Sequence, residues 1–283
     1  MNVLEWPISK ELLDSEDYAG NQFLARNISK KGYDQIIGEY IKITPSQIKH
    51  LISLVPGAWD SFYGIGIDLG GGVGCISSTI ASKKEVEKLF CIELVDDVVR
   101  LCQPIVKKEI LKEKEHKVIS VVGDYNQLQL ESHSIDFAVA WGSLHHATDP
   151  VITLRECRRV LKQKGQFVVI ERAHNNSTPD AEIDRLLNIV YSVEFLKRTY
   201  RDTGLRLTRR NNGEHEYRYC DWEEFFETAG FKVNQRVVLR TKQSKSSSKC
   251  NDAGLIEIQS EFDFRKEGGV RDSIACYILQ SQA

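Results

Sequence analysis

Short apolar runs alternate with amphipathic segments through the middle of the chain. The runs have the length of strands and lie over 64–69, 89–94, 117–125, 135–142 and 166–174. Between them, apolar residues recur at helical spacing, as at Leu154, Cys157, Val160 and Leu161. Strands that are apolar along their whole length are buried on both faces, which is typical of a parallel sheet covered by helices. The pattern therefore predicts an α/β fold.

Both ends of the chain depart from this alternation. Residues 1–60 are amphipathic and helical, and 221–230 predict a helix that is followed by strands at 231–240 and 272–280. Between those strands, the polar stretch KQSKSSSKCND opens a segment that predicts a flexible loop near 241–270. We therefore divide the chain into N-terminal helices that serve as a lid (1–60), an α/β core (61–174), a helical cap (175–220) and a C-terminal helix with the last strands (221–283).

Composition excludes several classes of protein. The chain has 283 residues, 41% of them hydrophobic, and a net charge of −2, whereas a general binder of nucleic acid or anionic membrane is usually basic. Seven cysteines form no C-x-x-C pair, so we expect no metal site. Several lie in apolar runs, as thiols do in a reducing cytosol. Neither a signal peptide nor a membrane-spanning run is visible, and we expect a cytoplasmic protein.

The first apolar run passes directly into a glycine-rich turn, Asp68-Leu69-Gly70-Gly71-Gly72-Val73-Gly74. Glycine lets the backbone bend sharply and lets a ligand lie against it. The dinucleotide pattern G-x-G-x-x-G would place Cys75 at its third glycine, which is a poor fit. The pattern acidic-x-G-x-G-x-G fits fully. An acidic residue here would repel a pyrophosphate but suits a ligand with an ammonium and a sulfonium group, such as S-adenosylmethionine.

Two more carboxylates follow neighbouring strands. Glu93 ends the second apolar run and can accept hydrogen bonds from two ribose hydroxyls. Asp124 follows the third run and can accept from an adenine amino group. These groups converge on the carboxyl ends of the strands, where open α/β sheets bind their ligands.

At these residues the chain resembles a known family, the class I S-adenosylmethionine-dependent methyltransferases. The resemblance covers Tyr63 to Arg172 and the C-terminal helix and strands, and rests on the ordered series IDLGGGVG, LFCIEL, VVGDY, SIDFAVAWGSLHHATDP and LRECRRVLKQKGQFVVIE. The last two resemble the small-molecule branch that includes ubiquinone- and menaquinone-pathway enzymes. The resemblance implies a Rossmann-like, mostly parallel sheet of seven strands, the last one antiparallel, with helices on both faces.

The resemblance also implies roles for single residues. Asp68, Gly70, Gly72 and Gly74 would hold the methionine end of the cofactor, and Glu93 would bind the ribose. Asp124 and Tyr125 would hold the adenine, while Trp141 and Gly142 would line the cofactor near its sulfonium. After transfer, the product would be S-adenosylhomocysteine.

The acceptor side is less defined by the sequence. Candidate bases are His145, His146 and His174, each with a structural role, such as capping, as the alternative. In the cap, the stretch from Phe195 to Arg218 has seven basic and three acidic residues, and its arginines could grip a carboxylate or phosphate. A solvated helix face is the alternative interpretation. The candidate substrate residues of the cap are Tyr200, His215, Tyr217 and Arg218.

These observations favour a methyltransferase that acts on a small molecule, at oxygen or nitrogen rather than carbon. The alternative is an RNA or protein methyltransferase that uses the basic 195–218 segment, but aromatic residues are only thinly interleaved there. A cofactor-binding subunit without catalysis and a nicotinamide-dependent dehydrogenase fit the acidic and glycine positions less well. We expect no nucleic-acid or membrane partner, and the sequence leaves a homodimer open.

Overall fold

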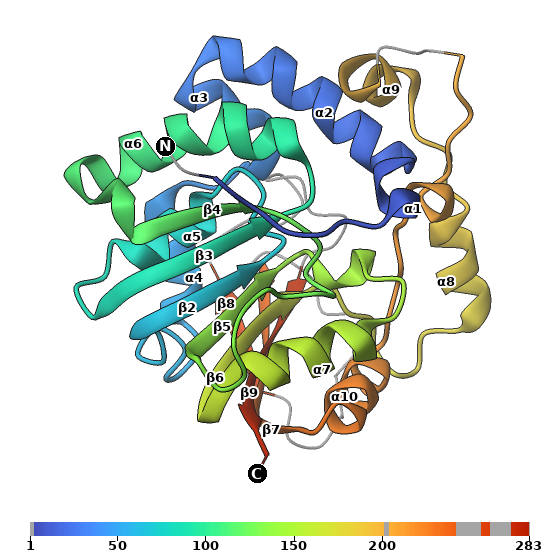
Figure 1. Cartoon of the computed structure of the whole chain (residues 1–283). Coiled ribbons are helices and arrows are strands. Elements are labelled where there is room, and N and C mark those ends of the chain that lie inside the picture. The colour runs from blue at the N-terminus through green and yellow to red at the C-terminus, as the bar shows by residue number, and fades with distance from the viewer. Residues whose placement is uncertain (1–2, 201–203, 242–255, 261–272, 283) are drawn as a thin grey trace.

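A central sheet with helices on both sides organises the chain (Figure 1). The structure, a computed structural model, describes residues 3–200, 204–241, 256–260 and 273–282. Its strands run in the order β1-β4-β3-β2-β5-β6-β9-β7-β8. Their bounds are β1 Leu4–Glu5, β2 Gly64–Leu69, β3 Val86–Glu93, β4 Val118–Val122, β5 Ile135–Trp141, β6 Leu161–Glu171, β7 Phe231–Thr241, β8 Ile256–Ser260 and β9 Ser273–Ser281.

The predicted mixed sheet is confirmed, with two strands more than expected. The last strand, β9, is antiparallel to both β6 and β7, and the other pairs are parallel. The additional strands are β1 beside β4 and β8 beside β7, both at the edges. A two-residue strand leaves no periodic signal, and β8 lies inside the segment that we predicted as a loop. The rest of that predicted loop, 242–255 and 261–270, lies outside the described residues.

Alternate residues of the central strands face two separate apolar layers, which explains their continuous hydrophobicity. In β5, Phe137 and Val139 belong to one core, and Ala138 and Ala140 belong to the other. One layer is formed by α4 (Pro45–Ser53), α5 (Cys75–Ala81) and α6 (Gln103–Leu111), and the other by α7 (Pro150–Val160) and α10 (Tyr219–Thr228).

Helix α7 begins where the sequence predicts but ends earlier. Asp149 caps its N-terminus by accepting a hydrogen bond from the Val151 N–H at 2.9 Å. The helical spacing of Leu154, Cys157, Val160 and Leu161 predicts a helix that continues towards Gly165, but α7 ends at Val160 because Leu161 already pairs with Ile135 in the sheet. Sheet pairing therefore overrides the helical spacing of the last turn.

The N-terminal helices and the cap meet beside the sheet. Helix α2 (Glu16–Ile28) contacts α9 (Val193–Thr199), while α8 (Asp180–Leu187) lies further along the same side (Figure 1). The contact is close at Gly20, where a Cβ atom would lie 2.5 Å from the Tyr200 ring. The remaining N-terminal elements are α1 (Lys10–Leu13), α3 (Tyr33–Ile36) and a π-helical turn, η2 (Ile37–Ile41). A lid formed jointly by the two segments stays a prediction.

Two further expectations concern cysteines and membranes. Of the six described cysteines, all are unpaired and five are buried; Cys220 is exposed, and Cys250 lies outside the described residues. None of the helices in the described ranges has the length and hydropathy needed to cross a membrane.

Candidate functional site

The site is centred where the order of the sheet reverses, between β2 and β5. The chain continues from β2 to β3 on one side and places β5 on the other, so the carboxyl ends of β2 and β5 meet. The Ser143 hydroxyl donates to the Leu69 carbonyl at 2.5 Å. A Cβ at Gly70 would lie 2.4 Å from that of Ser143, and Gly70 has φ +74°. Only glycine fits this close approach.

Glu93, the last residue of β3, is hydrogen-bonded to the glycine-rich turn. Its Oε2 accepts from the Gly72 N–H at 3.0 Å and its Oε1 from the Val95 N–H at 2.9 Å. Each carboxylate oxygen can accept a second hydrogen bond, as two ribose hydroxyls would require. The turn is covered from the N-terminal segment, because the ring of Tyr40 lies 3.2 Å from the Cβ position of Gly72.

Asp68, near the end of β2, links the strand to helix α5 across the glycine-rich turn. It is 1% exposed, and its Oδ2 accepts from the Ser77 hydroxyl at 2.5 Å in the first turn of α5. Burial raises the pKa of Asp68 to about 7. We therefore expect Asp68 to influence a cationic ligand through its field and through the shape of the turn that ends with Gly74 at the N-cap of α5.

The remaining predicted cofactor residues gather at the same edge of the sheet. Asp124 Oδ1 accepts from the Asn126 N–H at 2.8 Å, and the Tyr125 hydroxyl donates to the Ser143 carbonyl at 3.4 Å. Trp141 ends β5 and is half-buried. Gly142 is exposed, with φ +62° and nothing within 4 Å of its Cβ position. The backbone there is open to a ligand.

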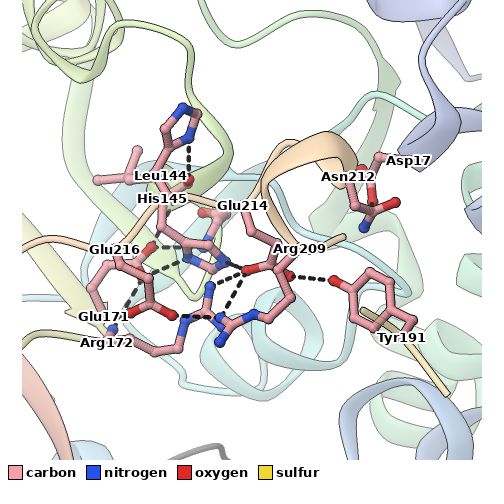
Figure 2. A network of polar contacts seen from close by, with 12 residues as sticks. Asp17, Leu144, His145, Glu171, Arg172, Tyr191, Arg209, Asn212, Glu214 and Glu216 are labelled. Atoms are coloured by element: carbon pink, nitrogen blue, oxygen red, sulfur yellow. Dashed lines mark hydrogen bonds and ion pairs between the residues drawn. The ribbon is translucent and has the colours of Figure 1, made fainter. Parts of the chain in front are cut away.

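His145 is held in one orientation by a buried carboxylate (Figure 2). Glu171, at the end of β6, accepts from the N–H groups of Ser143 and Leu144 at 2.8 and 2.7 Å. Its second oxygen lies 2.8 Å from His145 Nδ1. Although burial favours its neutral form, contact with His145, Arg172 and the Leu144 N–H lowers the pKa of Glu171. An ionised carboxylate cannot donate, so Nδ1 carries the hydrogen and Nε2 is left with its lone pair.

Glu214 faces the other ring nitrogen of His145. Its Oε2 lies 3.6 Å from His145 Nε2 and pairs with Arg172 and, at 3.5 Å, with Arg209. Burial alone would raise the pKa of Glu214, but Arg172 and the neighbouring histidines hold it far below the usual range. Tyr191 donates to the second oxygen at 3.4 Å (Figure 2). Two hydrogen-bond acceptors, His145 Nε2 and Glu214 Oε2, therefore lie side by side.

The other predicted acceptor-side residues have varied surroundings. His146 stacks on His145 with ring centroids 4.3 Å apart, and His215 Nδ1 lies 2.9 Å from the His145 carbonyl. His174 Nε2 lies 2.8 Å from a Glu216 oxygen. Tyr200, Tyr217 and Arg218 contact mainly protein: Tyr200 bonds Asn212, Tyr217 packs on Trp222 and Phe225, and Arg218 pairs with Asp180 and donates to the Thr178 carbonyl.

Sequence reasoning missed the carboxylates of this network. Glu214 and Glu216 alternate with His215 and Tyr217 in an extended segment, so the two pairs point to opposite sides. The rings of His215 and Tyr217 accordingly stack at an angle of 11°. This alternation of side chains is the signal in the sequence that could have revealed the two carboxylates. A group of His145, His146 and Glu214 has ligand atoms within 4.8 Å of one another, but Arg172 and Arg209 already pair with Glu214 there.

We expect His145 to make stability depend on pH between about 4 and 6.5. Burial and the nearby Arg172 lower the pKa of His145 to about 4 in the folded protein. The unfolded chain therefore binds more protons in this window, and stability falls as the pH drops from 6.5 towards 4, by on the order of 2–3 kcal/mol. Urea unfolding of the wild type and His145→Asn at pH 4.5 and 7.5 measures it. A stability difference between the two proteins that is the same at both pH values would contradict this assignment.

Comparisons with known proteins agree with this geometry. Residues 67–169 match the family described as a methyltransferase domain. An uncharacterised 37.1 kDa protein in transposon TN4556 of Streptomyces fradiae is 28% identical over 184 residues, which are 63% of this chain and 52% of that protein. The chain thus spans about half the length of the curated relative that it matches.

Solved structures share the fold at low identity. A methyltransferase dependent on S-adenosylmethionine from Leishmania major has a TM-score of 0.57 and 14% identity over 96% of this chain and 87% of its own. Another, from Methanosarcina mazei, has a TM-score of 0.52 and 18% identity over 77% of this chain and 92% of its own. The YcgJ protein of Bacillus subtilis has a TM-score of 0.53 and 14% identity over 84% of this chain and 99% of its own. Residues 67–169 thus match a methyltransferase domain, and the fold around them is the one that these S-adenosylmethionine-dependent methyltransferases share.

Proposed function

We propose that the protein transfers a methyl group from S-adenosylmethionine to a small-molecule acceptor, at oxygen or nitrogen. The observation that carries the proposal is the link between Glu93 and the Gly72 N–H, which sets a carboxylate with spare lone pairs against an open glycine-rich turn. The residues fit the cofactor: Glu93 would hold the ribose, Asp124 and Tyr125 the adenine, and the turn above Asp68 the methionine end.

S-adenosylmethionine supplies a methyl carbon that is already activated by a positive sulfur. The protein therefore has to align the acceptor and manage its proton. His145 suits the second task, because Glu171 fixes its ring and leaves Nε2 facing Glu214, next to the loop that Ser143 ties to β2. Aligning the acceptor would fall to the cap and the N-terminal helices.

The ion pairs of the cap favour a small acceptor over a polymer. Four of the seven basic residues in the 195–218 stretch pair with carboxylates of the same protein: Arg198 with Glu39, Arg209 with Glu216, Arg210 with Asp184 and Arg218 with Asp180. Arg201 lies outside the described residues. A surface neutralised in this way attracts phosphates weakly. The same pairs weaken the expectation that these arginines grip a carboxylate or phosphate of the acceptor.

Calorimetric titration of the protein tests the proposal directly. We expect S-adenosylmethionine and S-adenosylhomocysteine to bind at micromolar concentrations and NAD not to bind. Binding of NAD with no response to S-adenosylhomocysteine would overturn the proposal. Salt-sensitive binding of an RNA oligonucleotide would instead favour the polymer alternative.

A further inference from the structure

We infer that the methyl acceptor presents an amine nitrogen, which donates its N–H groups to His145 Nε2 and Glu214 and lies in the field of the Asp17 carboxylate. This inference rests on the proposed methyl transfer and names its substrate class. It follows from the hydrogen-bonding capacity of three groups that come from different parts of the chain.

The first observation is a pair of acceptors that face each other without a described donor between them. His145 Nε2 and Glu214 Oε2 are 3.6 Å apart, and Nδ1 holds the ring's hydrogen toward Glu171. Glu214 Oε2 already accepts from Arg172 and, at 3.5 Å, from Arg209, whereas no described group donates to His145 Nε2, so a ligand that donates to both atoms relieves the repulsion between their lone pairs. A hydroxyl has one hydrogen and satisfies one acceptor, whereas a primary amine has two N–H groups and a lone pair. An amine therefore matches this pair better than an alcohol does.

The second observation is a carboxylate that forms no ion pair with any described arginine or lysine. Asp17, in the first turn of α2, makes no ion pair within the described ranges. Its Oδ1 accepts from the side-chain amides of Asn21 and Asn212, at 3.1 and 3.5 Å, and no described group donates to Oδ2. A half-buried carboxylate that only amides contact is costly unless a cation approaches it.

Asp17 lies beside Asn212 of the cap (Figure 2), and its charge also reaches Glu93 of the predicted cofactor site. Asn212, which donates to Asp17, is bonded to the Tyr200 hydroxyl of the cap. On the cofactor side, burial raises the pKa of Tyr40, and the charges of Glu93 and Asp17 raise it further. His146 and Glu214 act on the pKa of Asp17, and the charge of Asp17 in turn raises the pKa values of Glu93, Tyr125 and Tyr200. No arginine or lysine is among them.

This arrangement favours methylation at nitrogen for a second reason. The amine lone pair forms a bond to the methyl carbon while the carbon–sulfur bond breaks and its electron pair stays on sulfur. The nitrogen gains the positive charge that sulfur loses, and it then gives one proton to His145 Nε2. Carboxylates at Asp17 and Glu214 stabilise charge that develops on nitrogen, which is the electrostatic contribution that enzymes use most. A hydroxyl acceptor becomes a neutral ether after methylation, so these carboxylates would stabilise its methylation less.

A single substitution separates amine recognition from cofactor binding. We expect Asp17→Asn to raise the KM for an amine acceptor at least tenfold and to change the Kd for S-adenosylhomocysteine less than twofold. Asp34→Asn, an exposed position at the start of α3, is the matched control and should change neither. If Asp17→Asn weakens S-adenosylhomocysteine binding tenfold, Asp17 holds the cofactor and the inference fails.

A panel of matched compounds tests the substrate class itself. Each set contains a primary amine, an alcohol and a carboxylic acid on one carbon skeleton, for example phenethylamine, 2-phenylethanol and phenylacetic acid. Methylated products are identified by mass spectrometry, and binding to the complex with S-adenosylhomocysteine is measured by calorimetry. Binding and N-methylation confined to amines support the inference. Products from alcohols or acids alone, or no amine bound by a protein that binds S-adenosylhomocysteine, overturn it while leaving the proposed function standing.

Discussion

Replacement of Glu93 by alanine is expected to weaken S-adenosylhomocysteine binding by about 100-fold or more. The substitution removes the acceptor of the Gly72 and Val95 N–H groups, and each buried donor left without a partner costs about 1–3 kcal/mol. It also removes the proposed charged partner of the ribose hydroxyls, and hydrogen bonds to a charged group are worth about 1.5–3 kcal/mol each. A combined loss of about 3 kcal/mol corresponds to more than 100-fold in Kd.

The same strand offers a control for this change. Glu87 lies on β3 as well but is exposed, so Glu87→Gln should leave the Kd unchanged. Circular dichroism and thermal unfolding show whether the Glu93 variant is folded when its binding is measured by calorimetry. A folded Glu93→Ala protein with the affinity of the wild type would show that the ribose is held elsewhere.

Replacement of His145 by alanine should reduce kcat for methyl transfer by about 10²- to 10⁴-fold, the usual contribution of a positioned proton acceptor. The ring connects Glu171 to the space in front of Glu214, and alanine leaves no acceptor at the Nε2 position. S-adenosylhomocysteine should bind with unchanged affinity, because the described contacts of the Glu93 side chain and of the glycine-rich turn do not involve this side chain. The rate is measured in single turnovers with the amine that the panel identifies.

Two variants separate a proton role from a structural one. His145→Asn keeps an N–H that can donate to Glu171 but has no atom at the Nε2 position, so it should be as slow as alanine. His116→Ala removes an exposed histidine in a 3₁₀ segment and should have wild-type activity. If His145→Asn retains the wild-type rate, the ring only supports the loop after β5 and another group receives the proton.

The fold could be predicted because its signals are local. The capping residue Asp149 and the start of α7 lie next to each other in sequence, as do β2 and its glycine-rich turn. The errors arose where distant pairing decides the structure. Leu161 is a strand residue because Ile135 lies beside it, and β8 exists because β7 offers an edge. Neither partner is visible in a short window of sequence.

The two halves of the site differ in the same way. Asp68 and Glu93 lie at the carboxyl ends of β2 and β3, and Asp124 follows β4, so strand order alone brought them to one edge. The acceptor side is assembled from α2, the ends of β5 and β6, and an extended piece of the cap. Glu171 accepts hydrogen bonds from four N–H groups, including that of the His145 ring, and is therefore the group that orients His145. Asp17 lies in the first turn of α2, and only the tertiary structure brings it beside Asn212 of the cap.

The sequence by itself determined the α/β class, the glycine-rich turn and the three carboxylates near the carboxyl ends of the strands. Backbone periodicity and glycine chemistry are properties of contiguous residues, so a short stretch of sequence reveals them. Only the tertiary structure decided which charged side chains pair with one another and which can still bind a ligand. The arginines of the cap face carboxylates, whereas Asp17 Oδ2 and His145 Nε2 have no donor among the residues that the structure describes. The reason is that the energy of a charge depends on its distance from partners that lie far away in the chain.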